Sequence, residues 1–117
     1  MADVSRSNTA KRAGEELGLV PVGQSLASND NTRILQAYDE VYRQLEEKGL
    51  ATWASDGSVP EKAAKYVVSM VAYNCLDTYP VSSARYQRIN KSYIEAVREL
   101  PNVIRNDYDD GKEPEDF

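Results

Sequence analysis

The sequence lacks histidine altogether, and among its 117 residues it has a single cysteine, Cys75. Without histidine the chain has neither the usual general base of enzymes nor the commonest metal ligand. One cysteine cannot form a disulfide within the chain. Cys75 lies on an apolar stripe, where a free thiol behaves as a small hydrophobic group. We therefore expect no catalytic residue, no metal site and no cofactor.

Long hydrophobic runs are also missing. The longest apolar stretch, residues 67–76, is interrupted by Ser69 and Asn74 and is too short to cross a bilayer. No stretch near Met1 joins a basic region to an apolar run of signal-peptide length. We expect a protein that is made in the cytoplasm and has no membrane span.

Positive charge is in the minority, since the formal net charge is −5. With 41% hydrophobic residues the chain is neither a basic protein that coats nucleic acid nor a wholly disordered acidic one. A net negative protein repels phosphate, which argues against tight DNA binding but would let a duplex slide past in a channel. The length indicates one helical domain at 1–101 and a C-terminal arm at 102–117.

Capping residues and glycines predict the first two helices. Ser5 or Ser7 can cap a short helix that Gly18 closes, because glycine suits the left-handed position beyond a helix end. A second helix begins within residues 28–32 and ends at Gly49. Its apolar side chains recur at helical spacing and predict a buried face; they are Ile34, Leu35, Tyr38, Val41, Tyr42 and Leu45.

A third helix is predicted from the spacing of Ser58 and Glu61, which is that of a capping box, with Pro60 in its first turn. Its wide apolar stripe extends to Tyr79 and contains many small residues, which suits close packing at the centre of a bundle. We expect it to be the most buried element.

A fourth helix is predicted from a cap at Ser82 or Ser83 to Leu100, where Pro101 ends it. Its predicted core face is Tyr86, Ile89, Tyr93, Ala96, Val97 and Leu100. The fold class that follows is all-α, a small four-helix bundle with an extended acidic C-terminal arm.

Two groups of side chains are candidates for contacts between subunits. Arg85, Arg88 and Lys91 share much of one helix face, which could bind DNA, meet the acids of a neighbouring subunit, or simply face solvent. Tyr66 and Tyr73 lie off the main apolar stripes, and tyrosine is common at protein interfaces. Both sets are therefore predicted as subunit-interface residues.

Residues 9–79 resemble the helical core of the head-to-tail adaptor proteins of tailed double-stranded DNA phages, closest to the tail accessory factors of short-tailed phages. The resemblance lies in the order of six local features. They are the stop at Leu17-Gly18-Leu19, the turn from Gly23 to Leu26, the stripe from Ile34 to Leu45, Gly49-Leu50 before Trp53, Val59-Pro60, and the small-residue helix from Ala72 to Tyr79.

The resemblance implies a structural virion protein at the head-tail junction and not an enzyme. Such proteins form a ring, usually of twelve copies, beneath the portal ring. The ring extends the DNA channel, through which duplex passes non-specifically, helps retain packaged DNA, and presents a platform for tail nozzle or tail tube proteins. The arm at 102–117 would then dock on the portal, and its candidate contact residues are Val103, Ile104, Tyr108 and Phe117.

Two other functions remain open from the sequence. A small helical DNA-binding regulator would use the face of Arg85, Arg88 and Lys91. A phage cell-wall hydrolase would need a pair of converging carboxylates, for which Glu46 and Glu47 are the example.

Overall fold

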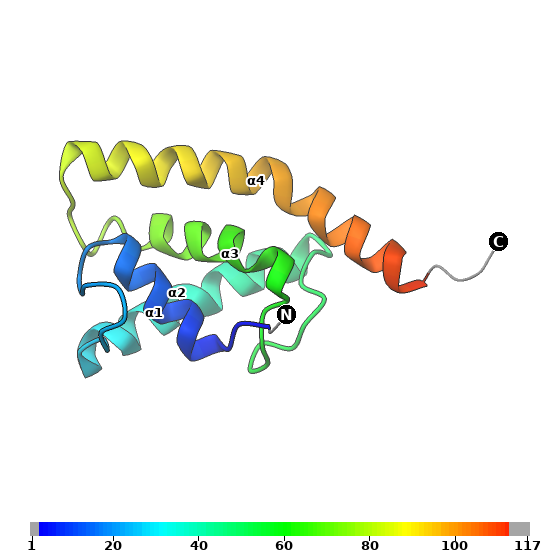
Figure 1. Cartoon of the computed structure of the whole chain (residues 1–117), viewed down its shortest axis with the longest axis horizontal. Coiled ribbons are helices and arrows are strands. Elements are labelled where there is room, and N and C mark those ends of the chain that lie inside the picture. The colour runs from blue at the N-terminus through cyan, green and yellow to red at the C-terminus, as the bar shows by residue number, and fades with distance from the viewer. Residues whose placement is uncertain (1–2, 113–117) are drawn as a thin grey trace.

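The structure is a computed structural model and is described for residues 3–112, with side chains through residue 105. These residues form four helices and no strand, which confirms the predicted all-α bundle (Figure 1). None of the helices in the described range is long and apolar enough to cross a membrane. The helices are α1 (Arg6–Glu16), α2 (Ser28–Glu47), α3 (Glu61–Asn74) and α4 (Ser83–Lys112).

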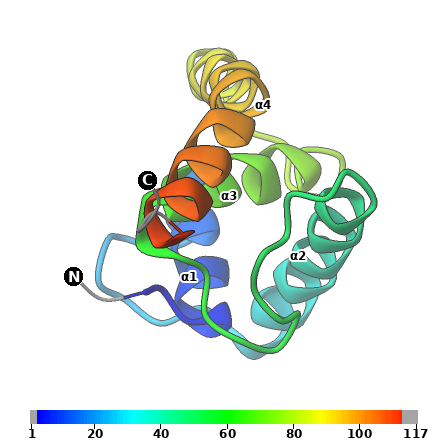
Figure 2. The ribbon, with the colours of Figure 1, turned by 90° about the vertical axis from the view of Figure 1, so that its right-hand side faces the viewer.

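Helix α3 lies at the centre of the bundle. Figure 2 shows α4 on one side of it and α1 and α2 on the other. It packs against all three, whereas α4 makes its main helix contacts with α3 alone. Small and branched side chains let the neighbouring helices approach closely. As predicted, α3 is the most buried helix; its buried residues are Ala63, Ala64, Val67, Val68, Met70, Val71 and Ala72.

The predicted caps at the start of α1 and α4 and the predicted glycines after α1 and α2 are confirmed, whereas α2 begins after Ala27 without a side-chain cap. Ser5 Oγ accepts a hydrogen bond from the Asn8 amide at 3.1 Å. Gly18 and Gly49 follow α1 and α2 with φ of 78° and 74°, a backbone conformation that other residues rarely adopt. Ser82 Oγ accepts from the Arg85 amide at 3.2 Å at the start of α4.

The predicted capping box before α3 is wrong. The helix begins after Pro60 without a side-chain cap from its own turn, and the Glu61 amide instead donates to Asp3 Oδ1 at 3.3 Å. Val4 and Val59 exchange two backbone hydrogen bonds of 2.8 and 2.7 Å just before this point. A segment distant in sequence therefore supplies the partner that Ser58 was expected to provide.

The predicted end of α3 at Tyr79 is also too late, because the helix ends at Asn74. The following residues form turns in which the Tyr79 amide donates to the Cys75 carbonyl at 2.9 Å. The Tyr79 hydroxyl donates to Asp30 Oδ1 in α2 at 2.8 Å. This tertiary hydrogen bond ties the turn to α2 and offsets the lost helical turn.

Helix α4 does not end at Leu100 as predicted but continues through Pro101 to Lys112. Proline removes one hydrogen bond and usually kinks a helix that continues past it. Figure 1 shows the last turns of α4 descending from the line of its first turns. Beyond the proline Ile104 is 6% exposed and joins the core, so its burial offsets the missing bond.

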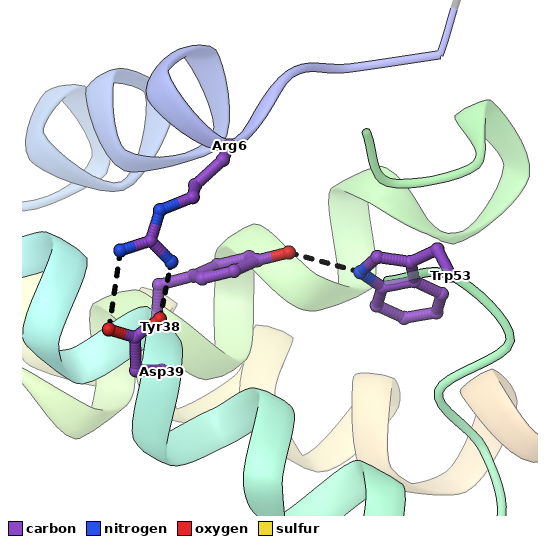
Figure 3. A network of polar contacts seen from close by, with 4 residues as sticks. All are labelled: Arg6, Tyr38, Asp39 and Trp53. Atoms are coloured by element: carbon purple, nitrogen blue, oxygen red, sulfur yellow. Dashed lines mark hydrogen bonds and ion pairs between the residues drawn. The ribbon is translucent and has the colours of Figure 1, made fainter. Parts of the chain in front are cut away.

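A polar network joins α1, α2 and the loop after α2 (Figure 3). The Trp53 indole N–H donates to the Tyr38 hydroxyl at 3.0 Å, and both residues are buried. The Arg6 guanidinium lies 5.4 Å from the Tyr38 ring centroid and pairs with Asp39. Burial is the main cause that raises the pKa of Tyr38. The Trp53 indole N–H and the Tyr38 hydroxyl, both buried, are thereby hydrogen-bonded to each other at the place where α1, α2 and the loop after α2 meet.

We predict that Tyr38→Phe lowers the free energy of unfolding by about 1–3 kcal/mol, because the buried indole N–H loses its acceptor. The matched control is Tyr42→Phe, which removes a hydrogen bond of 2.6 Å to the Trp53 carbonyl at a partly buried site that water can reach. Urea unfolding followed by circular dichroism measures both variants. Equal losses in the two would contradict the special role of the buried pair.

We also predict that a chain cut after Arg105 keeps its stability, whereas one cut after Pro101 loses about 2–5 kcal/mol, the usual cost of deleting a buried Ile side chain. The two chains differ in Ile104 and three residues beside it. The same urea experiment compares them with the full chain. Similar midpoints for the two shortened chains would show that the core ends at Leu100 after all.

Candidate functional site

One hollow in the described part of the chain is a groove of about 420 Å³ between α2 and α4. We call it the α2–α4 groove. Val41 and Leu45 line it from α2, while Met70 and Tyr73 of α3 form its floor. The groove exists because α2 and α4 both pack on α3 and make few contacts with each other. Its α4 wall and remaining lining residues are Tyr86, Tyr93, Val97, Gln44, Lys48, Asn74, Leu76 and Asp77.

A stacked pair of tyrosines joins the floor of the groove to its α4 wall. The rings of Tyr73 and Tyr93 lie 3.9 Å apart between centroids at an angle of 10°. Aromatic pairs of this kind are worth about 0.5–1.5 kcal/mol beyond the area that they bury. Tyr73 was predicted as a subunit-interface residue; the structure places it half-buried, with one ring face already covered by α4.

The α4 wall leaves apolar side chains uncovered. Tyr86 is 46% exposed and Val97 43% exposed, although the sequence predicted both for the core face of this helix. Ile94, which lies off the predicted stripe, is 55% exposed. Scattered apolar residues are ordinary on a surface, but Tyr86 and Val97 line the same groove, whereas Ile94 does not line it. The place of Tyr86 and Val97 on the predicted stripe gave no sign that they would stay uncovered.

The predicted basic face of α4 is divided in the structure. Arg85 Nη1 donates to the Glu16 carbonyl at the end of α1 at 2.9 Å, so it ties two helices of the same chain together. Arg88 and Lys91 remain exposed. A cation near the last carbonyls of a helix is favourable because those groups carry partial negative charge. Arg85 therefore has a structural contact within the subunit.

Tyr66 lies apart from the other interface candidates. It is half-buried and packs on the core cluster, and Lys65 Nζ lies 5.0 Å from its ring centroid. It does not line the α2–α4 groove. The structure thus brings Tyr73 into the groove and leaves Tyr66 at a different part of the α3 surface.

The predicted portal-docking residues fall into two groups. Ile104 is buried in the core and Val103 is partly buried, so the prediction that Ile104 contacts a portal is corrected for this conformation. Tyr108 belongs to the last turns of α4, but its side chain lies outside the described part. Phe117 lies outside the described residues.

A second, polar hollow lies beside the Arg6–Asp39 ion pair and is also lined by Arg43, Glu46 and Asp56. The hydrogen bond to Asp39 is the main cause that raises the pKa of Arg6. Glu47 does not line this hollow, because adjacent residues of a helix point in different directions. The pair of Glu46 and Glu47 that a hydrolase would need is therefore not brought together.

Cys75 lies in the core and is 2% exposed, as predicted from the apolar stripe. Burial raises the pKa of its thiol to about 11, which opposes formation of the reactive thiolate. Burial, followed by the hydrogen bond to Asp30, raises the pKa of Tyr79 to about 12. Among the described residues no cluster of three or more carboxylates or thiols could hold a metal ion.

We predict that Cys75 reacts with an aromatic disulfide reagent at pH 8 at least about 100-fold more slowly in the folded protein than in urea, because each pKa unit removes about nine-tenths of the thiolate. The release of coloured thiol measures the rate. The thiol's contribution to stability is full below its ordinary pKa of 9.0 and is lost as pH rises through about 11. Equal rates in both states would place the thiol at the surface.

Comparison with known proteins gave no match. No protein-family model, no curated protein and no solved structure is similar to this chain at a significant level. Proposals about its function therefore depend on its residues and on the geometry of its grooves and surfaces.

Proposed function

We propose that this chain is a structural assembly protein of the head-to-tail adaptor type, with copies that form a ring beneath a phage portal. The proposed role is mechanical and not catalytic. The resemblance of residues 9–79 to such adaptors supports it, and so does the four-helix core that contains those residues. In this proposal the ring extends the DNA channel, helps to retain packaged DNA and carries the tail proteins below it.

The observation that carries the proposal is a division of the chain into a neutral bundle and an acidic projection. We call residues 106–117 the acidic segment. It holds six of the 19 acidic residues and one of the 14 basic residues, so residues 1–105 contain thirteen of each. The whole net charge of −5 therefore lies in the acidic segment.

The position of α4 makes that division spatial as well. It has 30 residues, and Figure 1 shows its last turns leading away from the other helices. A charged segment that extends from a helix is suited to bind a partner. The helical part is already ordered, so binding costs little further conformational entropy. The acidic segment is accordingly the part that we propose docks on the portal.

Repetition supplies the strength of the proposed complex. Each short arm offers only a small contact, but many arms fixed on one ring engage together, so the second and later contacts occur at high effective concentration. Identical subunits in a closed ring also share one type of contact with their neighbours. Each arm can therefore bind the portal weakly while the whole ring stays firmly attached to it.

We predict that the chain binds isolated portal rings of short-tailed phages and that removal of the acidic segment abolishes this binding without unfolding the bundle. Light scattering and native mass spectrometry measure the mass of the mixture, and circular dichroism checks the fold of the shortened chain. The matched control is Val22→Asp, which alters a side chain that is 86% exposed in the loop after α1.

Unchanged portal binding by the shortened chain would contradict the docking role of the acidic segment. A full chain that stays monomeric with every portal ring would count against the adaptor function as a whole. Binding of duplex DNA would then be measured, with its salt dependence, because the exposed Arg88 and Lys91 are what a DNA-binding regulator would use.

A further inference from the structure

Positive charge in this chain is concentrated in the first part of α4. Residues 83–105 hold five basic and two acidic residues, whereas residues 1–82 hold eight basic and eleven acidic ones. The net charge is therefore −3 before this stretch and +3 within it, and the acidic segment that follows adds −5. A protein that is acidic as a whole thus contains one basic part.

Four of the five basic side chains in this stretch lie on the outer side of α4. Lys91, Arg98 and Arg105 recur every seven residues, so each successive side chain turns by only about 20° around the helix. Arg88 precedes Lys91 by three residues and neighbours it on the helix surface. All four are exposed, and we call them the basic ridge. The buried residues of α4 lie on the opposite side; they are Ile89, Ala96, Leu100 and Ile104.

Contacts within the chain leave most of the charge of the ridge available. Arg98 Nε donates to Glu99 Oε2 at 3.0 Å, but the Arg98 side chain is still 68% exposed, and such exposed pairs are weak. Arg105 Nη1 donates to the neutral Asn102 Oδ1 at 3.2 Å. Glu95 is exposed on the same face, so the ridge together with this acid has a net charge of +3.

The ridge has little of what a protein partner needs. None of its residues lines the α2–α4 groove or the polar hollow beside Arg6, and the large apolar side chain exposed next to it is Ile94. Protein interfaces have an apolar centre with charges at the rim. Phosphate contacts need only charged groups and hydrogen-bond donors. The ridge therefore fits a phosphate backbone better than it fits the surface of a protein.

The position of α4 gives a long polyanion room to approach. Helix α4 makes its main helix contacts with α3 alone, and Figure 2 shows it at the edge of the molecule, on the far side of α3 from α1 and α2. The ridge extends over about 25 Å of helix. Duplex DNA carries one negative charge per about 1.7 Å of its axis. Several phosphates therefore lie along this length whatever the base sequence is.

We propose that the basic ridge of α4 binds the phosphate backbone of duplex DNA without regard to sequence. The contact is weak in one copy, because it uses four basic side chains and the nearby acidic segment repels phosphate. Repeated around a ring, it would steady packaged duplex and still let it slide, since no base edge is read. This role rests on the proposed function, whereas the contact itself does not.

Fluorescence anisotropy of a labelled duplex of mixed sequence measures the contact with the full chain and without any portal. Four phosphate contacts predict that the logarithm of the binding constant falls with the logarithm of the salt concentration with a slope of about −3.6. The triple variant Lys91→Gln, Arg98→Gln, Arg105→Gln should bind about tenfold more weakly. Its slope should fall to about −0.9, the value for the remaining Arg88. A second duplex of unrelated sequence should bind as tightly as the first.

The matched control removes three exposed charges from other helices. Arg12→Gln, Arg43→Gln, Lys48→Gln alters side chains of α1, α2 and the end of α2. Each triple variant changes the net charge by three, from −5 to −8, so total charge is the same in both. The control should keep the slope of the unaltered chain. Circular dichroism checks that the variants are folded, and Lys91→Gln alone, which should reduce the slope by about 1, replaces the ridge variant if it is not.

Three outcomes would overturn the inference. They are a full chain that binds no duplex even at about 0.02 M salt, equal weakening by the ridge variant and the control, and a strong preference for one of the two duplexes. The second would mean that net charge alone governs binding, and the third would indicate a sequence-reading regulator. The ridge variant keeps the acidic segment and should still bind portal rings, so the two proposals can fail separately.

Discussion

The structure depends on the packing of one helix, α3, against the other three. Its buried face combines alanine and valine, and the small side chains at Ala63, Ala64 and Ala72 allow neighbouring helices to come close. Because α1, α2 and α4 all contact α3, a loss of packing there would detach α4 from the pair that α1 and α2 form with each other. The Tyr38–Trp53 hydrogen bond and the Val4–Val59 backbone pairing fix the surrounding segments to this centre.

The same central packing creates the α2–α4 groove. A helix that bridges two others can keep them apart, and α4 makes its main contacts with α3 and not with α2. The apolar stripe of α4 is wider than the face that α3 covers, so Tyr86 and Val97 remain exposed.

Local signals predicted the helices wherever the determining contacts lie within a few residues. The Ser5 cap, the positive φ at Gly18 and the Ser82 cap are of this kind. The failures came where a distant residue replaced a local partner. Asp3 took the place of Ser58 at the start of α3, and the burial of Ile104 carried α4 past Pro101. Arg85 was expected at an interface, but its partner is the carbonyl of Glu16 in the same chain.

The sequence by itself determined the all-α class, the number of helices, the burial of Cys75 and the acidic end of the chain, because periodicity, capping and composition act locally. Only the tertiary structure decided which part of each apolar stripe is covered. Tyr86, Tyr93 and Val97 are alike in the sequence pattern, yet Tyr93 stacks on Tyr73 while the other two remain exposed. That difference arises because Tyr73 of α3 covers Tyr93, whereas α4 makes its main helix contacts with α3 and not with α2.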